Sequence, residues 1–300
     1  MMLAASLLCA AALAAPPRTK PADVTTKAPA PGDFVGAEVC ASCHEAETKG
    51  FATNPHTRLA LAHNNSGATC ESCHGPGKAH VEGGGDVTKI FNPAKASAKE
   101  VDEKCLGCHA AAHANFKRSA HAEAGVSCVS CHSVHDGADK EHLLRAAEPT
   151  LCFQCHNDQK SQFSMPFHHK VEEGLVHCSD CHDPHGTLQS KGLRATADQN
   201  AVCVKCHTEA AGPYIYEHPV VKTEGCLSCH SPHGSPNARL LNVANMNTLC
   251  LQCHSATNSS AFPHVVSPTG PAHSQVATEV ACTNCHSQIH GSNSSNIYFK

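Results

Sequence analysis

The motif Cys-x-x-Cys-His occurs ten times in this sequence, and it constrains the fold more than any other feature. The motif is typical of c-type haem attachment, in which two thiols add to the haem vinyl groups and the histidine becomes an axial iron ligand. Residues three and four apart lie on one face of a helical turn, so one turn can present both sulfurs and the imidazole. The sequence therefore predicts ten covalently bound haem c groups.

The motifs use 20 of the 21 cysteines, and only Cys9 is left over. The predicted thioether cysteines are Cys40, Cys43, Cys70, Cys73, Cys105, Cys108, Cys128, Cys131, Cys152, Cys155, Cys178, Cys181, Cys203, Cys206, Cys226, Cys229, Cys250, Cys253, Cys282 and Cys285. The predicted proximal ligands are His44, His74, His109, His132, His156, His182, His207, His230, His254 and His286. Zinc knuckles and a disulfide framework are the alternatives, but neither needs a histidine after every cysteine pair.

The composition agrees with a core made of porphyrins. Aromatic residues are 4% of the chain and tryptophan is absent, whereas a chain of 300 residues usually builds its core from large side chains. The formal charge is -4, with 22 Lys and Arg against 26 Asp and Glu. Because there is no basic run and no set of aromatic stacking platforms, the sequence does not indicate nucleic-acid binding.

The first residues are typical of export. Residues 1–15 form a predicted signal peptide, with an apolar run over 3–14 that ends in small residues and is too short to span a bilayer. A lipid on Cys9 is the alternative, although Leu8 before it is not small. Residues 16–35 are rich in Pro, Ala and Thr and predict a flexible linker. No later segment is apolar enough to be a transmembrane helix, so we expect a periplasmic protein.

The motifs come in pairs, which predicts one decahaem domain over 36–293, followed by a tail at 294–300. Its five dihaem units cover about 36–95, 96–145, 146–195, 196–245 and 246–293. Two-residue spacings joined by Gly- and Pro-containing loops predict short α-helices and negligible sheet. We expect a mostly irregular, elongated rod organised around ten haems, in which the apoprotein does not fold.

Further histidines follow the same period. One stands 10 to 13 residues after each first-motif histidine, and another stands 3 to 6 residues after each second-motif histidine. The ten predicted distal ligands are His56, His80, His121, His135, His169, His185, His218, His233, His264 and His290. Three positions have rivals: His63 for His56, His168 for His169, and His273 for His264. Met165 and Met246 do not recur in other units and are interpreted as packing residues.

His233 lies only three residues after His230, and Pro232 stiffens the connection. Three residues span at most about 10 Å, too little to pass round a porphyrin edge to its opposite face. His233 must therefore point to a different iron from His230, and the same holds for His135, His185 and His290. Which iron each longer-gap histidine reaches is left open by the sequence.

Two axial imidazoles leave an iron no open coordination position, which favours electron transfer over catalysis on a bound substrate. We therefore expect an electron-transfer protein and not an enzyme. A soluble periplasmic electron shuttle or store is the first alternative. A multihaem oxidoreductase with one open haem is the second, although no motif is altered to Cys-x-x-Cys-Lys.

The motifs SDCHDPHG at 179–186 and CTNCHSQIHGSN at 282–293 resemble the periplasmic decahaem cytochromes of the MtrA/DmsE/PioA family. The resemblance covers about 36–293 and implies a rod of bis-histidine haems that docks into an outer-membrane β-barrel porin. It also implies electron exchange with an extracellular multihaem cytochrome and with periplasmic or inner-membrane cytochromes, with His290 near one end of the row. The chain departs from the family after Asn293, where SSNIYFK stands in place of a further His-Pro.

Overall fold

The computed structural model describes residues 30–62, 68–195, 198–254 and 281–299. Within these ranges α6 (Ala98–His109) is the longest helix, with 12 residues. The other α-helices are α1 (Ala37–Ala41), α2 (Glu45–Ala52), α3 (Pro55–Ala62), α4 (Cys70–His74), α5 (Lys78–Glu82), α7 (Ala120–Glu123), α8 (Cys128–Cys131), α9 (Thr150–Phe153), α10 (Asn157–Phe163), α11 (Cys178–Cys181), α12 (Asn200–Cys203), α13 (Pro219–Thr223) and α14 (Met246–Leu251).

Single 3-10 turns and one short sheet complete the regular structure of these ranges. The 3-10 turns are Pro31–Asp33, Val87–Lys89, Phe116–Arg118, Ser190–Gly192, Thr208–Ala210, Cys226–Ser228, Ala238–Leu240 and Cys282–Asn284. The sheet pairs β1 (Tyr216–Glu217) antiparallel with β2 (Gly291–Ser292). The predictions of short helices and little sheet are confirmed.

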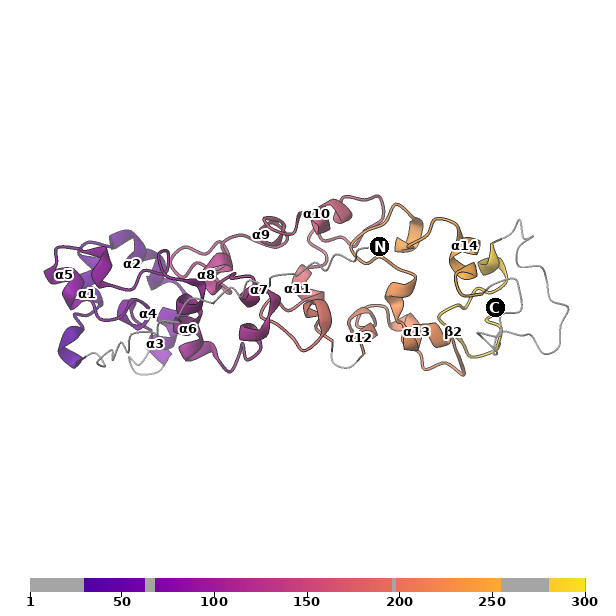
Figure 1. Ribbon diagram of the computed structural model, residues 1–300, viewed down its shortest axis with the longest axis horizontal. Coiled ribbons are helices and arrows are strands. Elements are labelled where there is room, and N and C mark those ends of the chain that lie inside the picture. Colours follow the sequence, from indigo (N-terminus) through magenta and orange to yellow (C-terminus); the bar gives the residue numbers. More distant parts are fainter. Residues whose placement is uncertain (1–29, 63–67, 196–197, 255–280, 300) are drawn as a thin grey trace, which may run out of the picture.

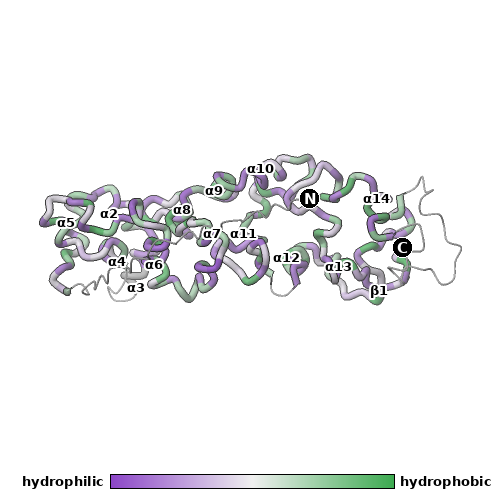
Figure 2. The backbone as a smooth tube through the Cα atoms, viewed as in Figure 1, coloured by the Kyte–Doolittle hydropathy of each residue, from purple (hydrophilic) through white to green (hydrophobic). Residues whose placement is uncertain are grey.

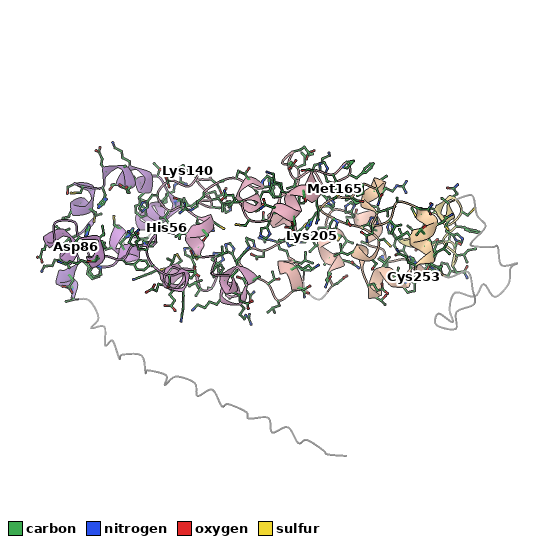
Figure 3. The ribbon with its side chains drawn as sticks, turned by 45° about the horizontal axis from the view of Figure 1, so that its top comes forward. His56, Asp86, Lys140, Met165, Lys205 and Cys253 are labelled. Carbon is green, nitrogen blue, oxygen red and sulfur yellow. The ribbon has the colours of Figure 1, made fainter. Side chains whose placement is uncertain are left out.

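The units follow one another along the longest axis of the molecule broadly in chain order, from the indigo to the yellow end (Figure 1). Helix α5 lies toward one end and helix α14 toward the other. Figure 3 shows the same progression in its labelled side chains, with Asp86 and His56 of the first unit toward one end and Cys253 of the fifth unit toward the other. Each unit therefore has its closest neighbours in the units that precede and follow it in the sequence.

Three of the second motifs start a helix at their first cysteine, namely α4, α8 and α11. In each, the residue just before the second cysteine accepts a hydrogen bond from the backbone N–H that precedes the helix. These residues are Ser72, Ser130 and Asp180, with N···O distances of 3.0, 3.2 and 2.7 Å. The capping fixes a turn that is too short to be stable by itself.

Large apolar side chains do not form a continuous core. In the described ranges the buried apolar residues are Val101, Leu106, Phe116, Leu143, Phe163, Val171 and Leu241. Figure 2 shows hydrophilic and hydrophobic stretches alternating along the whole tube. Folding must therefore depend on groups other than these few side chains.

Helices that could cross a bilayer were not found among the described residues. The predicted signal peptide at 1–15 and most of the predicted linker lie outside the described residues. So do three histidines of the sequence analysis, His63, His264 and His273.

Candidate haem sites

The two motifs of each unit meet at their first cysteines. The side chains of Cys105 and Cys128 are hydrogen-bond partners, and this bond, together with burial, raises the pKa of the Cys128 thiol. The corresponding pairs are Cys40–Cys70, Cys152–Cys178, Cys203–Cys226 and Cys250–Cys282. The two haem attachment points of a unit therefore lie side by side.

In the first four units the second cysteine of the second motif instead lies toward the next unit. Cys73 interacts electrostatically with Cys105 and Cys108, and Cys131 interacts with Cys152 and Cys155. The same relationship joins Cys181 to Cys206 and Cys229 to Cys253. The attachment points thus form one continuous series that follows the order of the motifs in the sequence.

Nine of the ten proximal histidines face a predicted distal histidine across a gap. The ring centroids of the facing pairs are 6.3 Å apart for His44–His80, 6.0 for His74–His135, 5.9 for His109–His56, 6.0 for His132–His185, 6.0 for His156–His121, 6.1 for His182–His233, 6.2 for His207–His169, 6.3 for His230–His290 and 6.1 for His254–His218. A metal–imidazole bond of about 2 Å on each side puts ring centroids roughly 6 Å apart. These gaps fit an iron held between two imidazoles.

Most facing pairs join different units. A longer-gap histidine faces the first motif of the following unit, as His169 faces His207. A short-gap histidine faces the second motif of the preceding unit, so His233 lies opposite His182 and not opposite His230. His80 is the exception, since it faces His44 of its own unit. The remaining predicted distal ligand, His264, lies outside the described residues.

Backbone carbonyls fix the tautomer of many of these rings. The Nδ1 of His182 donates to the carbonyl oxygen of Lys191 over 2.9 Å, and the Nδ1 of His230 donates to the carbonyl oxygen of Arg239 over 2.9 Å. The same contact joins His74 to Phe91, His132 to His142, and His286 to Ile297. A carbonyl can only accept, so Nδ1 carries the proton and Nε2 keeps the lone pair that a metal needs.

The longer-gap histidines use the loop that carries the next short-gap histidine. Nδ1 of His169 donates to the carbonyl of Pro232 over 2.6 Å, and Nδ1 of His218 donates to that of Ile289 over 2.9 Å. Nδ1 of His121 likewise donates to Pro184 over 3.0 Å. Each acceptor immediately precedes a short-gap histidine, so two predicted distal ligands are coupled at each of these junctions.

The junction of the first two units breaks this pattern. The carbonyl of Val134, just before His135, accepts from the Asn54 amide over 2.7 Å. His56 Nδ1 is consequently buried without a hydrogen-bond partner. Asn54, which is 2% exposed, also accepts from the backbone N–H of His56. A single buried amide therefore positions both histidines of this junction.

Burial favours the neutral form of six of the predicted distal histidines. It lowers the pKa of His185 to about 4, with the neighbouring His113 ring adding to the effect. Burial is also the main cause of the lowered pKa of His56, His135, His218, His233 and His290. Neutral imidazole is the form that binds a metal, so this environment favours ligation.

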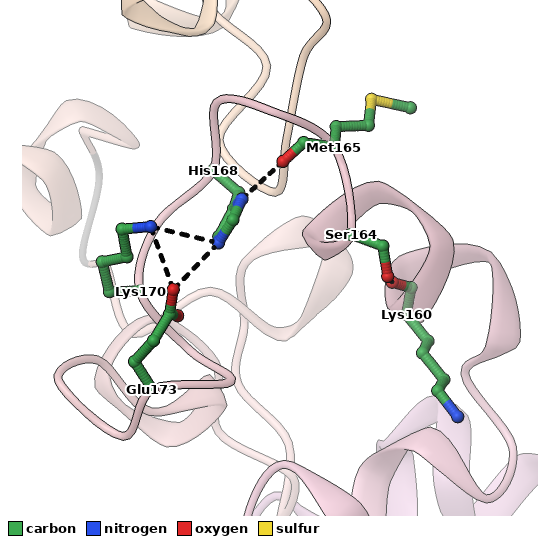
Figure 4. Close-up of polar contacts among 6 residues, drawn as sticks. All are labelled: Lys160, Ser164, Met165, His168, Lys170 and Glu173. Atoms are coloured by element: carbon green, nitrogen blue, oxygen red, sulfur yellow. Dashed lines mark hydrogen bonds and ion pairs between the residues drawn. The ribbon is translucent and has the colours of Figure 1, made fainter.

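His168 and His169 lie in different environments. His169 faces His207, whereas His168 Nδ1 donates to the Met165 carbonyl over 2.5 Å. On its other side, His168 Nε2 lies 3.3 Å from Glu173, which also pairs with Lys170 (Figure 4). This geometry favours His169 as the ligand and assigns His168 to a polar network.

Some functional residues were missed by the sequence analysis. The side chain three residues before the first motif accepts a hydrogen bond from the first backbone N–H of the second motif, at 2.9 Å in three units. The bonds run from Cys128 N to Asp102, from Cys226 N to Asn200 and from Cys282 N to Asn247. The recurrence of Asp or Asn at this position is the signal that could have revealed them. In the third unit Glu148, one residue earlier, accepts from Ser179 N over 3.1 Å.

The comparisons with known proteins agree with haem attachment through these motifs. A family model described as a doubled CXXCH motif matches residues 120–161, 168–212 and 218–259, and one described as cytochrome c554 and c-prime matches 84–133. Over 268 residues the chain is 35% identical to the multihaem cytochrome MtrA of Shewanella baltica strain OS185, covering 86% of this chain and 79% of that protein.

The chain belongs to the MtrA family of multihaem c-type cytochromes. The family resemblance predicted from the motifs is thus confirmed, and with it the covalent attachment of several haem c groups. The MtrA-like chain is also 32% identical to the c-type cytochrome NrfB of Escherichia coli O6:H1 over 41% of its length. It is 29% identical to the polyhaem cytochrome OmcB of Geobacter sulfurreducens, but it spans only 31% of that relative.

Proposed function

We propose that this protein carries ten haem c groups, each with two histidine ligands, in one elongated row that conducts electrons. The observation that supports this most strongly is the set of nine facing histidine pairs, with ring centroids 5.9 to 6.3 Å apart. His286 and His264 would form the tenth pair. Bis-imidazole haem iron exchanges one electron between Fe(III) and Fe(II).

The side chains and backbone serve this function by holding neighbouring haem sites close together and by fixing the orientation of the imidazole ligands. Neighbouring cysteines such as Cys105 and Cys128 bring the edges of successive attachment sites together. Carbonyls such as that of Lys191 hold the imidazoles in the ligating tautomer. Burial of rings such as that of His233 lowers their pKa and so favours the neutral, ligating form. An electron can then pass along the series without any side chain changing its proton content.

We further propose that the row connects the periplasm with the outer membrane, through a β-barrel partner and an extracellular multihaem cytochrome. The charge distribution supports docking at the C-terminal end. Residues 240–254 and 281–299 contain no Asp, Glu, Lys or Arg, whereas charges are frequent in the first four units. Nearby Ile215, Ile297 and Phe299 are exposed. Depletion of charge is typical of the centre of a stable protein interface.

Three measurements on the purified holoprotein test the electron conduit. Mass spectrometry should give ten haems per chain, and electron paramagnetic resonance of the oxidised protein should give low-spin signals only. Carbon monoxide should leave the reduced spectrum unchanged. A carbon monoxide adduct at one haem would instead support an oxidoreductase with an open site.

The partner is tested by co-purification from detergent-extracted outer membranes of the native host. We expect an integral β-barrel protein to accompany the tagged chain. Ile297→Glu should weaken this association, whereas Val87→Glu, at an exposed apolar position in the first unit, should not. A monomer that never associates with a barrel would favour the soluble shuttle.

A further inference from the structure

The junction between the two motifs of a unit differs along the chain in one respect, the charge of the capping side chain. In the second unit the cap is Asp102, which is 8% exposed and accepts from Cys128 N over 2.9 Å. In the fourth unit it is Asn200, also 8% exposed, with the same 2.9 Å contact to Cys226 N. The two caps therefore share burial and geometry but not charge.

The fifth unit repeats the neutral version. Asn247 accepts from Cys282 N over 2.9 Å and lies 3.1 Å from Cys282 Sγ. The described residues of this unit include no charged side chain at all. In the fourth unit Asp198 interacts with Cys203 and Cys226, but it is exposed, so solvent screens its charge.

The other early units place a carboxylate at the junction by different routes. Glu71 is 8% exposed and interacts with Cys40. In the third unit the Glu148 carboxylate lies within 4.8 Å of the sulfurs of Cys152 and Cys178. The first three junctions thus contain a carboxylate, whereas the last two are capped by an amide, Asn200 buried and Asn247 half-buried.

We propose that the Asp102 carboxylate lowers the reduction potential of the haem pair attached through Cys105 and Cys128. At the corresponding position Asn200 and Asn247 carry no charge. The reduction potentials of the haem pairs attached beside them are therefore higher than those of the pair beside Asp102. The inference rests on the proposed haem pairs but does not need a barrel partner.

The physical reason is the sign and the burial of the charge. Reduction adds one electron to an iron, and a fixed negative charge nearby disfavours that addition. The interaction is strong only where water is excluded, and Asp102 lies at a buried contact with the cysteine that carries the haem. An asparagine keeps the hydrogen bond to the backbone and removes the charge, so the capping role and the electrostatic role can be separated.

The test is a spectroelectrochemical titration of the full holoprotein, in which each iron takes one electron. Asp102→Asn should favour the reduced form of two of the ten haems by about tenfold, about 59 mV for a one-electron couple. The matched control is Glu103→Gln on the same helix, which removes an equal charge from an exposed side chain and should leave the titration curve unchanged.

Asn200→Asp and Asn247→Asp are the reciprocal variants, and each should lower the potential of two haems. A curve for Asp102→Asn that coincides with that of Glu103→Gln overturns the proposal. If Asp102→Asn cannot be purified with its haems, the two reciprocal variants test the proposal. Unchanged reduction potentials in both of them would overturn it. The haem content of every variant is measured independently by mass spectrometry. A wild-type count below ten would contradict the proposed ten-haem row and not this inference.

Discussion

His169 Nδ1 lies 2.6 Å from the carbonyl oxygen of Pro232, the residue immediately before His233. His169 faces His207 and His233 faces His182, so this hydrogen bond couples the predicted distal ligands of two different haems. A loop displaced at one site should therefore disturb the other.

The first prediction separates the two adjacent histidines of this loop. His169→Ala should leave one iron with an open position, because the ring opposite His207 is removed. Electron paramagnetic resonance should show one high-spin haem, and the reduced protein should bind one carbon monoxide per chain. His168→Ala is the matched control and should stay fully low-spin, since among the described residues His168 makes its polar contacts with Met165, Lys170 and Glu173. The reverse outcome would reassign the ligand.

The second prediction concerns Gly234, which follows His233 and packs against the preceding unit. A Cβ at this position would overlap the carbonyl of Gln162. Gly234→Ala should therefore push the loop away, cost roughly 1–3 kcal/mol and lower the Tm of the holoprotein. Gly32→Ala, outside every attachment motif, meets open space and should leave the Tm unchanged. Equal Tm values for the two variants would show that the loop tolerates the displacement.

The third prediction uses the unpartnered Nδ1 of His56. Ser119 stands two residues before His121, where the first unit has Asn54, and His121 Nδ1 does reach a carbonyl. Asn54→Ser should free the Val134 carbonyl for His56, and the new bond, worth about 1 kcal/mol, makes the imidazole more basic. The potential of the haem held by His109 should fall in a redox titration. Ser119→Asn should raise that of the haem held by His156, and no change in either variant would contradict the assignment.

The fourth prediction concerns acid pH and Glu71. Burial opposes the charged form, but the backbone N–H groups of Gly77, Gly36 and Val35 donate to it and lower the pKa of Glu71 below its ordinary 4.5. The folded pKa is depressed, so this stabilisation is fully present above about pH 4.5 and is lost as the pH falls through the folded value.

Amide hydrogen exchange at Val35 and Gly36 tests this prediction. Exchange should accelerate below pH 4.5 relative to the intrinsic rate, and Glu71→Gln should accelerate it even at neutral pH. Glu82→Gln, an exposed control, should behave like the wild type. Protection that is equal in all three proteins would assign the ordering of this segment to other contacts.

Much of this molecule could be predicted from the sequence because the attachment motif is local. Cys-x-x-Cys-His specifies its own short turn, and ten copies predict the short helices and the scarcity of large apolar core residues. The reach of three residues indicated that His233 could not share an iron with His230, and the structure places it opposite His182.

The rest depends on contacts between segments that are distant in the sequence. That His56 lies opposite His109 and not His44 is decided by packing between units. The role of Asp102 likewise depends on a backbone N–H 26 residues away, so the side chain alone does not reveal it. The unpartnered His56 Nδ1 follows from competition with Asn54 for one carbonyl, which no single motif encodes.

The cross-unit pairing of histidines has a consequence for how such a chain can change its length. In the proposed ligation each interior unit supplies one imidazole to the following unit and one to the preceding unit, so the ligand pattern repeats with a period of one unit. If one whole interior unit were removed or duplicated, every iron would still have two imidazole donors in this pattern. If the chain were instead truncated at a unit boundary, the haems next to the cut would lose the imidazoles that the missing units supply. The length of the haem row can therefore change in steps of one unit without altering any ligand set.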